Sequence, residues 1–195
     1  INKNIMQNLL SFNREKLLTI LKQNNISQQH GKSIFKAIYQ NLAFDIGKYS
    51  FLPKKFLSLQ ALLNVELPKV HTYKVSTEDS SIKLILELAI DGNKIETVLI
   101  PEKNRLTLCV SSQVGCLRGC VFCATGKMGL HRNLLVEEIV AQLLCVKKWL
   151  SLNKNKESFS IYTNNNITNI VFMGMGEPLD NIDNLILAID ILSDP

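Results

Sequence analysis

Hydrophobic residues in the first 68 positions recur at the spacing of amphipathic helices. Asn13 is a typical helix cap, and it precedes apolar residues at Leu17, Leu18, Ile20 and Leu21. Two further helices are expected, with apolar positions at Ile34, Phe35, Ile38 and Tyr39 in one and, after Pro53, at Phe56, Leu57, Leu62 and Leu63 in the other. The pattern therefore predicts a small helical accessory domain over residues 1–68.

The pattern changes after residue 68 to that of strands. Residues 71–75, 82–90 and 95–100 are rich in β-branched and other apolar residues. The pair Asp91-Gly92 between the last two segments is a strong hairpin turn sequence. We expect a β-hairpin extension over residues 69–101.

The rest of the chain alternates between strand and helix patterns. The expected elements are a strand over 106–111, a Gly- and Cys-rich loop over 112–132, a helix capped by Asn133, a polar loop over 151–166, a strand over 167–173 suited to burial on both faces, and a helix over 181–192. This βα alternation predicts a parallel sheet or barrel. Two such units cannot close a barrel, so we expect the full protein to be longer.

Composition narrows the class of protein. Hydrophobic residues make up 46% of the 195 positions and charged residues 20%, which is typical of a globular protein rather than a disordered one. No apolar run is long enough to span a bilayer. The net charge of +5 permits an RNA partner without demanding one. The five cysteines are odd in number and partly crowded, which indicates thiolate ligands in a reducing compartment rather than a secreted disulfide framework.

The crowded cysteines are Cys116, Cys120 and Cys123, with the spacing C-x3-C-x2-C. Three thiolates on one short loop can bind three irons of a four-iron cluster, and the fourth iron then lacks a protein ligand. S-adenosylmethionine (SAM) can chelate that iron through its amino and carboxylate groups. An electron from the cluster then cleaves the sulfonium and gives a 5′-deoxyadenosyl radical. This spacing after a barrel strand, with Phe122 before the last cysteine, is the radical SAM signature.

Zinc is the alternative ligand for these thiols. A structural zinc site usually has four ligands, commonly in two paired knuckles. Here the fourth ligand would have to come from Cys109, Cys145 or His131, because a second knuckle is missing.

A second candidate site follows the strand expected over 167–173. Gly174-Met175-Gly176-Glu177 would lie beyond the carboxyl end of that strand, where ligands bind in such sheets. Glycines let a ligand approach the backbone closely, and Glu177 could accept a hydrogen bond from the SAM ammonium. Taken alone, such a turn is more often only a tight loop.

Longer stretches around both sites carry a more specific resemblance. They read LCVSSQVGC at 108–116, CATGKMGL at 123–130, RNL at 132–134 and FMGMGEPL at 172–179. Together they closely resemble the RlmN family of dual-specificity RNA methyltransferases in the radical SAM superfamily. The resemblance is dense over residues 94–192 and faint before them. It implies an α/β fold in which residues 102–195 form the N-terminal part of a radical SAM (β/α) barrel, preceded by the helical domain and the β-hairpin extension.

The resemblance also implies an activity and its cofactors. Members of the family methylate C2 of an adenine in 23S rRNA and in tRNA, using a 4Fe-4S cluster and SAM. That carbon is electron-poor and is no nucleophile, so a radical is needed to form the new bond. In the family, one SAM methylates a protein cysteine, and a second SAM supplies the radical that takes hydrogen from this methyl group. The resulting carbon radical adds to the base.

The same resemblance assigns roles to two further residues of this chain. Cys109 aligns with the cysteine that releases the product by forming a disulfide bond. Glu96 aligns with the base that removes the C2 proton, a role that requires a carboxylate with a pKa suited to its site. Without the resemblance, Cys109 would be interpreted as a small buried strand residue and Glu96 as a solvated carboxylate.

Two departures from the family pattern limit the carry-over. The methyl-carrying cysteine belongs to a C-terminal region that this chain lacks, and Cys145 is no substitute because it falls within a predicted helix. We therefore expect that this chain alone does not complete the reaction. The family usually has a basic, Gln-containing helix start where this chain has residues 30–39. Lys32 and Lys36 there are as consistent with a solvated face as with RNA contact.

Two alternative functions remain open. A Cfr-type enzyme would methylate C8 of the adenine, but that group tends to have Gly-Glu-Ala where this chain has Pro178 after Glu177, which favours C2. A truncated, non-catalytic module that binds a cluster or RNA is the other alternative. The resemblance further implies a monomer with no membrane association that takes electrons from a donor such as flavodoxin or ferredoxin. The expected location is the cytoplasm, with an organelle as the alternative.

Overall fold

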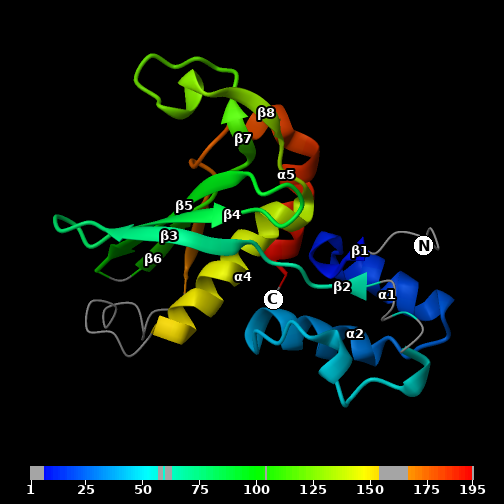
Figure 1. Cartoon of the computed structure of the whole chain (residues 1–195). Helices are drawn as coiled ribbons and strands as arrows, with labels where there is room; N and C mark the ends of the chain where they lie inside the picture. Colours follow the sequence, from blue (N-terminus) through cyan, green and yellow to red (C-terminus); the bar gives the residue numbers. More distant parts are fainter. Residues whose placement is uncertain (1–6, 57–58, 60–62, 104, 154–166, 195) are drawn as a thin grey trace.

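The computed structural model describes residues 7–56, 59, 63–103, 105–153 and 167–194. A five-stranded sheet with the order β3-β4-β5-β6-β9 forms its centre (Figure 1). The strands are β3 (Lys69–Val75), β4 (Ile82–Glu87), β5 (Lys94–Glu102), β6 (Arg105–Cys109) and β9 (Asn169–Val171). Neighbours from β3 to β6 are antiparallel, whereas β6 and β9 are parallel. The strands expected around the Asp91-Gly92 turn are thus confirmed, and Gly92 takes the left-handed φ of +71°.

One face of the sheet is covered by the long helix α4 (Val136–Asn153). Alternate residues of β5 point to that helix and are fully buried, and Thr97 among them hydrogen-bonds Gln142 of α4. The intervening residues, which include Glu96 and Val98, lie on the opposite face and are partly exposed. We call this second face the open face.

Helix α5 (Ile182–Leu192) packs beside α4, following the short 3-10 helix η7 (Pro178–Asn181). The order β6, α4, β9, α5 is the predicted βα alternation. In this chain β9 is the edge strand of the sheet and its residues are exposed or half-buried, so the expectation of a strand buried on both faces is wrong here. Burial on both faces requires packing against each face of the strand, and in β9 Asn169 is exposed while Ile170 and Val171 are only partly buried.

The N-terminal residues form short helices, namely η1 (Leu9–Ser11), α1 (Arg14–Gln23), α2 (Gln29–Phe35), the π-helical turn η2 (Lys36–Gln40), η3 (Ile46–Lys48) and η4 (Lys54–Phe56). Asn13 caps α1 as predicted, because its side-chain oxygen accepts a hydrogen bond from the Lys16 amide. Leu57 and Leu62 of the third expected helix fall outside the described residues. Leu63 is not helical: it lies in β2 (Leu63–Asn64), which pairs in parallel with β1 (Gln7–Asn8). That partner is more than 50 residues away, so local periodicity did not reveal it.

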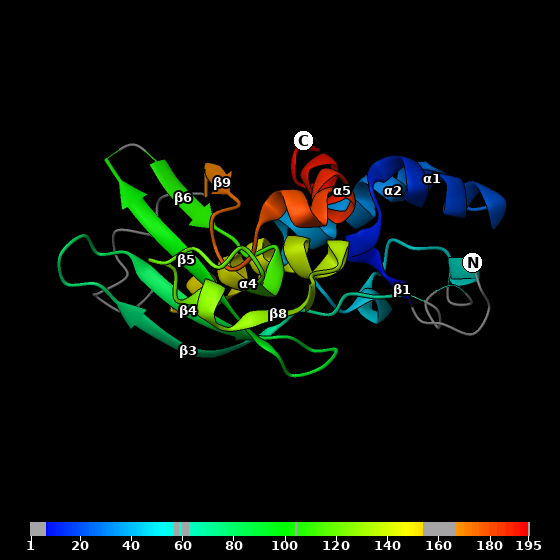
Figure 2. The same cartoon turned by 90° about the horizontal axis from the view of Figure 1, so that it is seen from above.

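The helical region packs against α4 and α5 at the side of the sheet (Figure 2). Asn13 Nδ2 donates to Asp190 Oδ2 over 2.7 Å, and Lys147 Nζ donates to the Tyr39 carbonyl over 3.0 Å. The domain boundaries stay a prediction, and β3, β4 and β5 share one sheet with β6 and β9. The polar loop expected at 151–166 falls largely outside the described residues, and α4 continues to Asn153. None of the described helices is both long and apolar enough to cross a membrane.

Candidate cluster and cofactor site

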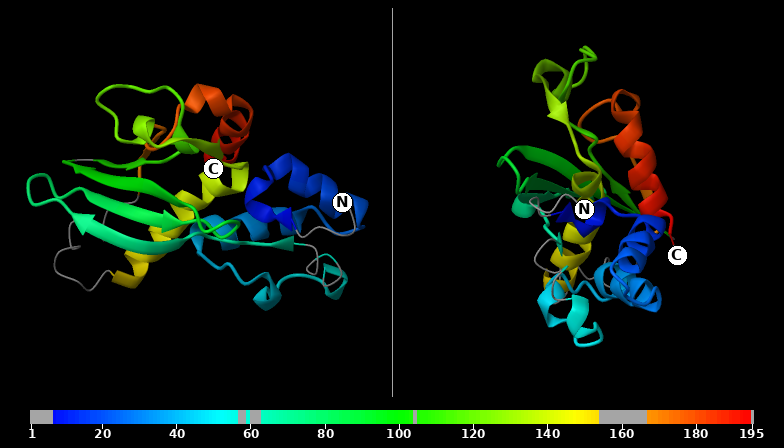
Figure 3. Two further views of the ribbon diagram at one scale, coloured as in Figure 1. Left: turned by 45° about the horizontal axis from the view of Figure 1, so that its top comes forward. Right: turned by 90° about the vertical axis from the view of Figure 1, so that its right-hand side faces the viewer.

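The segment expected to be a Gly- and Cys-rich loop contains a further two-stranded sheet. Strands β7 (Gln113–Cys116) and β8 (Gly129–Asn133) pair in antiparallel fashion and project from one end of the main sheet (Figure 3). Gly115 has a φ of +77°, and a Cβ there would lie 1.9 Å from the Gly129 carbonyl oxygen. Glycine is therefore required for the two strands to approach each other closely. Strand β7 ends at Cys116, where the cysteine loop (residues 116–128) begins.

The three cysteines of the motif lie on this loop and differ in exposure. Cys116 is buried, Cys123 is half-buried and Cys120 is exposed. The Cys123 amide donates to the Cys120 carbonyl over 3.0 Å, which folds the two residues into one turn. The Gly126 amide hydrogen-bonds the Cys123 sulfur and lowers the pKa of this thiol, which favours the thiolate that a metal requires.

These donors fit an iron–sulfur cluster in number and chemistry. Three thiols on one short loop form the ligand set of a cluster that keeps one iron open. Within the described residues, however, no three His, Cys, Asp or Glu side chains are gathered closely enough to hold a metal ion. All five cysteines are free, so the expected disulfide bond is not supported.

Cys145, one candidate for a fourth zinc ligand, is placed away from the loop. It lies on α4, where its Sγ donates to the Pro68 carbonyl over 3.3 Å, and burial raises the pKa of its thiol to about 11. A buried, neutral thiol on the helix-covered side of the sheet is a packing residue. The exclusion of Cys145 as the methyl-carrying residue agrees with this position.

The glycine loop (residues 174–177) lies directly against the segment between β6 and β7. A Cβ on Gly174 would be 2.8 Å from Ser111 Oγ and from Val110, and a Cβ on Gly176, whose φ is +101°, would be 2.6 Å from Gln113 Cβ. Four hydrogen bonds of 2.9–3.0 Å hold the contact, namely Gly174 N to Val110 O, Met175 N to Ser111 Oγ, Ser112 N to Met175 O, and Glu177 N to Gln113 Oε1. Both glycines are thus required for close packing of the two loops.

Glu177 has a local role in the structure. Its Oε1 accepts a hydrogen bond from the Leu179 amide over 3.2 Å, so that Glu177 caps η7 with Pro178 at the first position of the helix. The cap fixes the carboxylate beside the start of the second βα loop. Binding of the SAM ammonium by Glu177 stays a prediction.

The sheet register brings Glu96 and Cys109 together on the open face. Cys109 pairs with Val98, and cross-strand partners share a face, so Glu96 is the diagonal neighbour of Cys109. Diagonal neighbours lie about 7–8 Å apart. Burial raises the pKa of the Cys109 thiol, and a hydrogen bond from the Met173 amide opposes this shift. Glu96 forms a 3.1 Å ion pair with Lys83.

A buried polar network behind this pair was not foreseen from the sequence. Gln142 is fully buried on α4, and its Oε1 accepts hydrogen bonds from the Ser111 amide (2.8 Å) and Thr97 Oγ1 (2.9 Å). Its Nε2 donates to the Ser111 carbonyl over 2.9 Å, while Ser111 Oγ donates to the Glu96 carbonyl over 2.6 Å. A polar residue on the apolar face of α4 was the pattern that could have revealed it.

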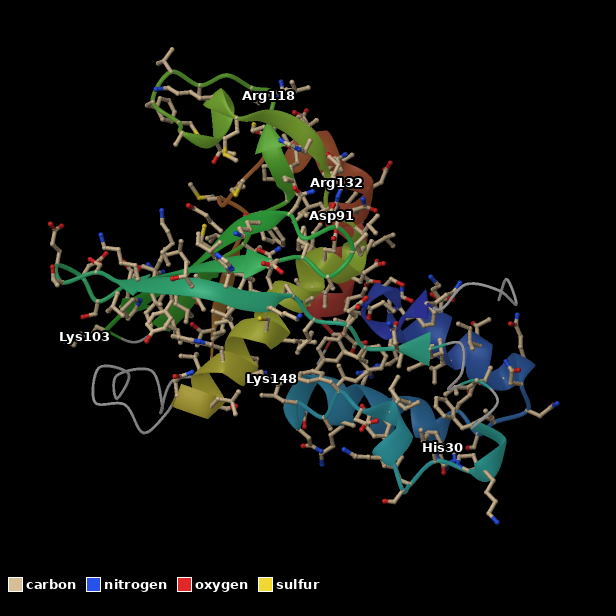
Figure 4. All side chains as sticks on the ribbon, viewed as in Figure 1. His30, Asp91, Lys103, Arg118, Arg132 and Lys148 are labelled. Carbon is tan, nitrogen blue, oxygen red and sulfur yellow. The ribbon has the colours of Figure 1, made fainter. Side chains whose placement is uncertain are left out.

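Two arginines tie the hairpin to its surroundings (Figure 4). Arg132 of β8 contacts Asp91 over 2.7 Å and both carboxylate oxygens of Glu138 on α4, whereas Arg118 of the cysteine loop contacts Asp180 of η7. The sequence predicted that Asn133 caps α4, but in the structure it does not. Its side chain instead accepts from Gln113 and donates to the Asp180 carbonyl, 47 residues further on.

Comparison with known proteins finds similar RNA methyltransferases. The chain is 40% identical over 189 residues to a probable dual-specificity RNA methyltransferase RlmN of Dictyoglomus thermophilum, covering 96% of this chain and 51% of that protein. It is 37% identical over 188 residues to the dual-specificity RNA methyltransferase RlmN of Francisella tularensis subsp. novicida, covering 48% of that protein. The chain matches about half of an RlmN-type dual-specificity RNA methyltransferase. No family model matches it.

The fold is also similar to that of a solved structure. The structure superimposes on a radical SAM methyltransferase from Sphaerobacter thermophilus with a TM-score of 0.78 and 34% sequence identity, covering 96% of this chain and 52% of that one. The predicted α/β fold and the resemblance to RlmN-type enzymes are therefore confirmed. The resemblance extends to the helical region, although the sequence motifs were dense only from residue 94 onward.

Proposed function

We propose that the protein containing this chain is a radical SAM RNA methyltransferase that methylates C2 of adenine in 23S rRNA and in tRNA. The observation that carries this proposal is the open face, where Glu96 and Cys109 are diagonal neighbours at the end of the sheet that leads into the cysteine and glycine loops. A thiol and a carboxylate so placed can act on the same base. The names of the similar proteins support RNA as the substrate.

The cysteine loop and the glycine loop would hold the cofactors. Cys116, Cys120 and Cys123 would bind a 4Fe-4S cluster, and Gly176 and Glu177 would bind SAM. When bound, the cluster and SAM supply a carbon-centred radical. The methyl-carrying cysteine is not among the 195 residues, and the chain spans about half the length of the similar proteins. We therefore assign complete turnover to the full-length protein.

Glu96 and Cys109 take the later steps of the proposed reaction. The Glu96 carboxylate accepts the proton from C2 of the base once the new carbon–carbon bond has formed, while Lys83 orients this carboxylate. The Cys109 thiolate then attacks the sulfur of the methyl-carrying cysteine. A disulfide forms, the bond from that sulfur to the transferred carbon breaks, and this carbon takes a proton from solvent and stays on the base as its methyl group. The unpaired electron that radical addition leaves on the base would be taken up by the bound cluster. Burial of Cys109 keeps water away from this thiol.

The proposal is tested by identifying the nucleoside product. The full-length protein is incubated anaerobically with SAM, a reductant and unmodified 23S rRNA or tRNA, and the digested RNA is compared with 2-methyladenosine and 8-methyladenosine standards. We expect the wild-type protein to produce 2-methyladenosine. The Glu96→Gln and Cys109→Ala variants should each release this product more slowly than the wild-type protein. A product at C8 would show the Cfr-type reaction instead. Equal activity from the 195-residue chain alone would contradict the need for the missing cysteine.

A further inference from the structure

Arg118 lies inside the metal-binding motif, between Cys116 and Cys120, yet it is not one of its expected ligands. Its guanidinium contacts both carboxylate oxygens of Asp180: Nε donates to Oδ2 over 2.8 Å, and Nη2 contacts Oδ1. Asp180 belongs to η7, three residues after Glu177. The ion pair therefore joins the loop that carries the cysteines to the segment that carries the proposed SAM ligand.

The position of this contact differs from that of the other links between the two segments. Two of those links lie at the base of the projecting hairpin. Gln113 accepts a hydrogen bond from the Glu177 amide, and Asn133 donates one to the Asp180 carbonyl. Arg118 lies beyond Cys116, in the part of the loop that leads to Cys120, and Figure 4 labels it there. Its own amide also donates to Cys116 Sγ over 3.4 Å. Arg118 thus links the loop itself, and not only its base, to η7.

The charge and geometry of the pair suit a positioning role. A planar guanidinium that meets a carboxylate at two points fixes its direction as well as its distance. A single exposed ion pair contributes little to overall stability, so its main effect is on the relative placement of the two loops.

We propose that Arg118 and Asp180 are positioning residues that hold the cysteine loop in register with Glu177, so that one SAM molecule reaches both the cluster and the glycine loop. This inference rests on the proposed function, because it presupposes that SAM binds between these loops. Neither residue contacts the reacting atoms. Loss of the pair should weaken SAM binding while the three cysteines still assemble the cluster.

The test compares variants of the full-length protein. Arg118→Gln and Asp180→Asn each remove one partner, Arg118→Gln/Asp180→Asn removes both, and Arg118→Asp/Asp180→Arg exchanges the charges. Arg105→Gln is the control, since two guanidinium nitrogens of Arg105 contact the same oxygen of Glu102, and Arg105 is similarly exposed at the other end of the sheet. Iron content, thermal unfolding and the SAM dependence of the reduced-cluster EPR signal are measured for each.

We expect wild-type iron content and unfolding temperature in every variant. SAM should be bound about fivefold more weakly by both single variants, the size expected for one good ion pair. The double-removal variant should be no weaker than the single ones, and the charge exchange should recover part of the loss. Unchanged SAM affinity in the single variants, with a normal wild-type response, would overturn this inference alone. Absence of a cluster or of any SAM response in the wild-type protein would overturn the proposed function as well.

Discussion

Replacement of Gln142 by Leu tests the buried network that supports the site. Leucine is similar in size, so the substitution leaves little empty space in the core. It leaves three polar groups without their partner: the Thr97 hydroxyl, the Ser111 amide and the Ser111 carbonyl. Because Gln142 and Thr97 are fully buried, water cannot replace the lost contacts without opening the core.

The expected loss of stability follows from these three groups. Each buried group left unpaired costs about 1–3 kcal/mol, so the three groups together should lower the free energy of unfolding of Gln142→Leu by at least about 3 kcal/mol. Ser111 also contacts the Glu96 carbonyl and the Met175 amide, so the effect should reach both the open face and the glycine loop. The doubly substituted Thr97→Val/Gln142→Leu protein should lose less than the sum of the two single changes, because the hydroxyl is no longer stranded.

Urea unfolding of the full-length protein measures this prediction. The control is Gln23→Leu, which places the same change at an exposed position near the end of α1. A loss below about 1 kcal/mol for Gln142→Leu, or one equal to that of the control, would refute the assignment of three stranded polar groups.

The glycine loop and the Asp91–Arg132 ion pair give two further predictions. Gly176→Ala should cost more than about 2 kcal/mol of unfolding free energy, because its φ is +101° and the new Cβ would lie 2.6 Å from Gln113 Cβ. Gly92→Ala, with a φ of +71° and nothing within 4 Å, should cost less, and equal losses in unfolding experiments would contradict the packing argument. The hydrogen bond from Arg132 lowers the pKa of Asp91 from 3.8 to about 2, so the pair stabilises the fold above about pH 4 and this contribution disappears as the pH falls toward 2. Asp91→Asn should therefore lose about 1 kcal/mol at pH 7 and less at pH 3, and an equal loss at both values would refute this account.

Regular patterns made much of the fold predictable. Alternation of apolar and polar residues on both sides of Asp91-Gly92 correctly predicted strands β4 and β5, and the apolar face of residues 135–150 predicted α4. These elements depend on local periodicity and on a turn with its own sequence preference. Asn13 was predictable for the same reason, since a helix cap acts within three residues.

Long-range contacts explain the errors. The β7–β8 pairing depends on the approach of Gly115 to Gly129 rather than on alternating side chains, and the short strands therefore resemble a loop in the sequence. Asn133 has the residue type of a helix cap, but it bonds Asp180 instead. Leu63 was assigned to a helix from its local apolar spacing. Its strand partner, Gln7, lies at the other end of the N-terminal region, so the local sequence carried no sign of the pairing.

The candidate site was likewise only partly predictable from the sequence. The spacing of Cys116, Cys120 and Cys123 was evident from the sequence because all three cysteines lie on one loop. The relation between Glu96 and Cys109 required the register of β5 and β6, which only the structure gives. Arg118 and Asp180 are 62 residues apart, so no local pattern identifies them as partners.

The cluster and SAM site is tested most directly by EPR spectroscopy. The full-length protein and the 195-residue chain would be reconstituted anaerobically with iron and sulfide, reduced, and measured with and without SAM. We expect a four-iron signal that SAM perturbs in the full-length protein, and its loss when Cys116, Cys120 and Cys123 are replaced by alanine. A full-length protein that binds zinc in place of iron, or whose four-iron signal does not respond to SAM, would contradict a radical SAM site on this loop.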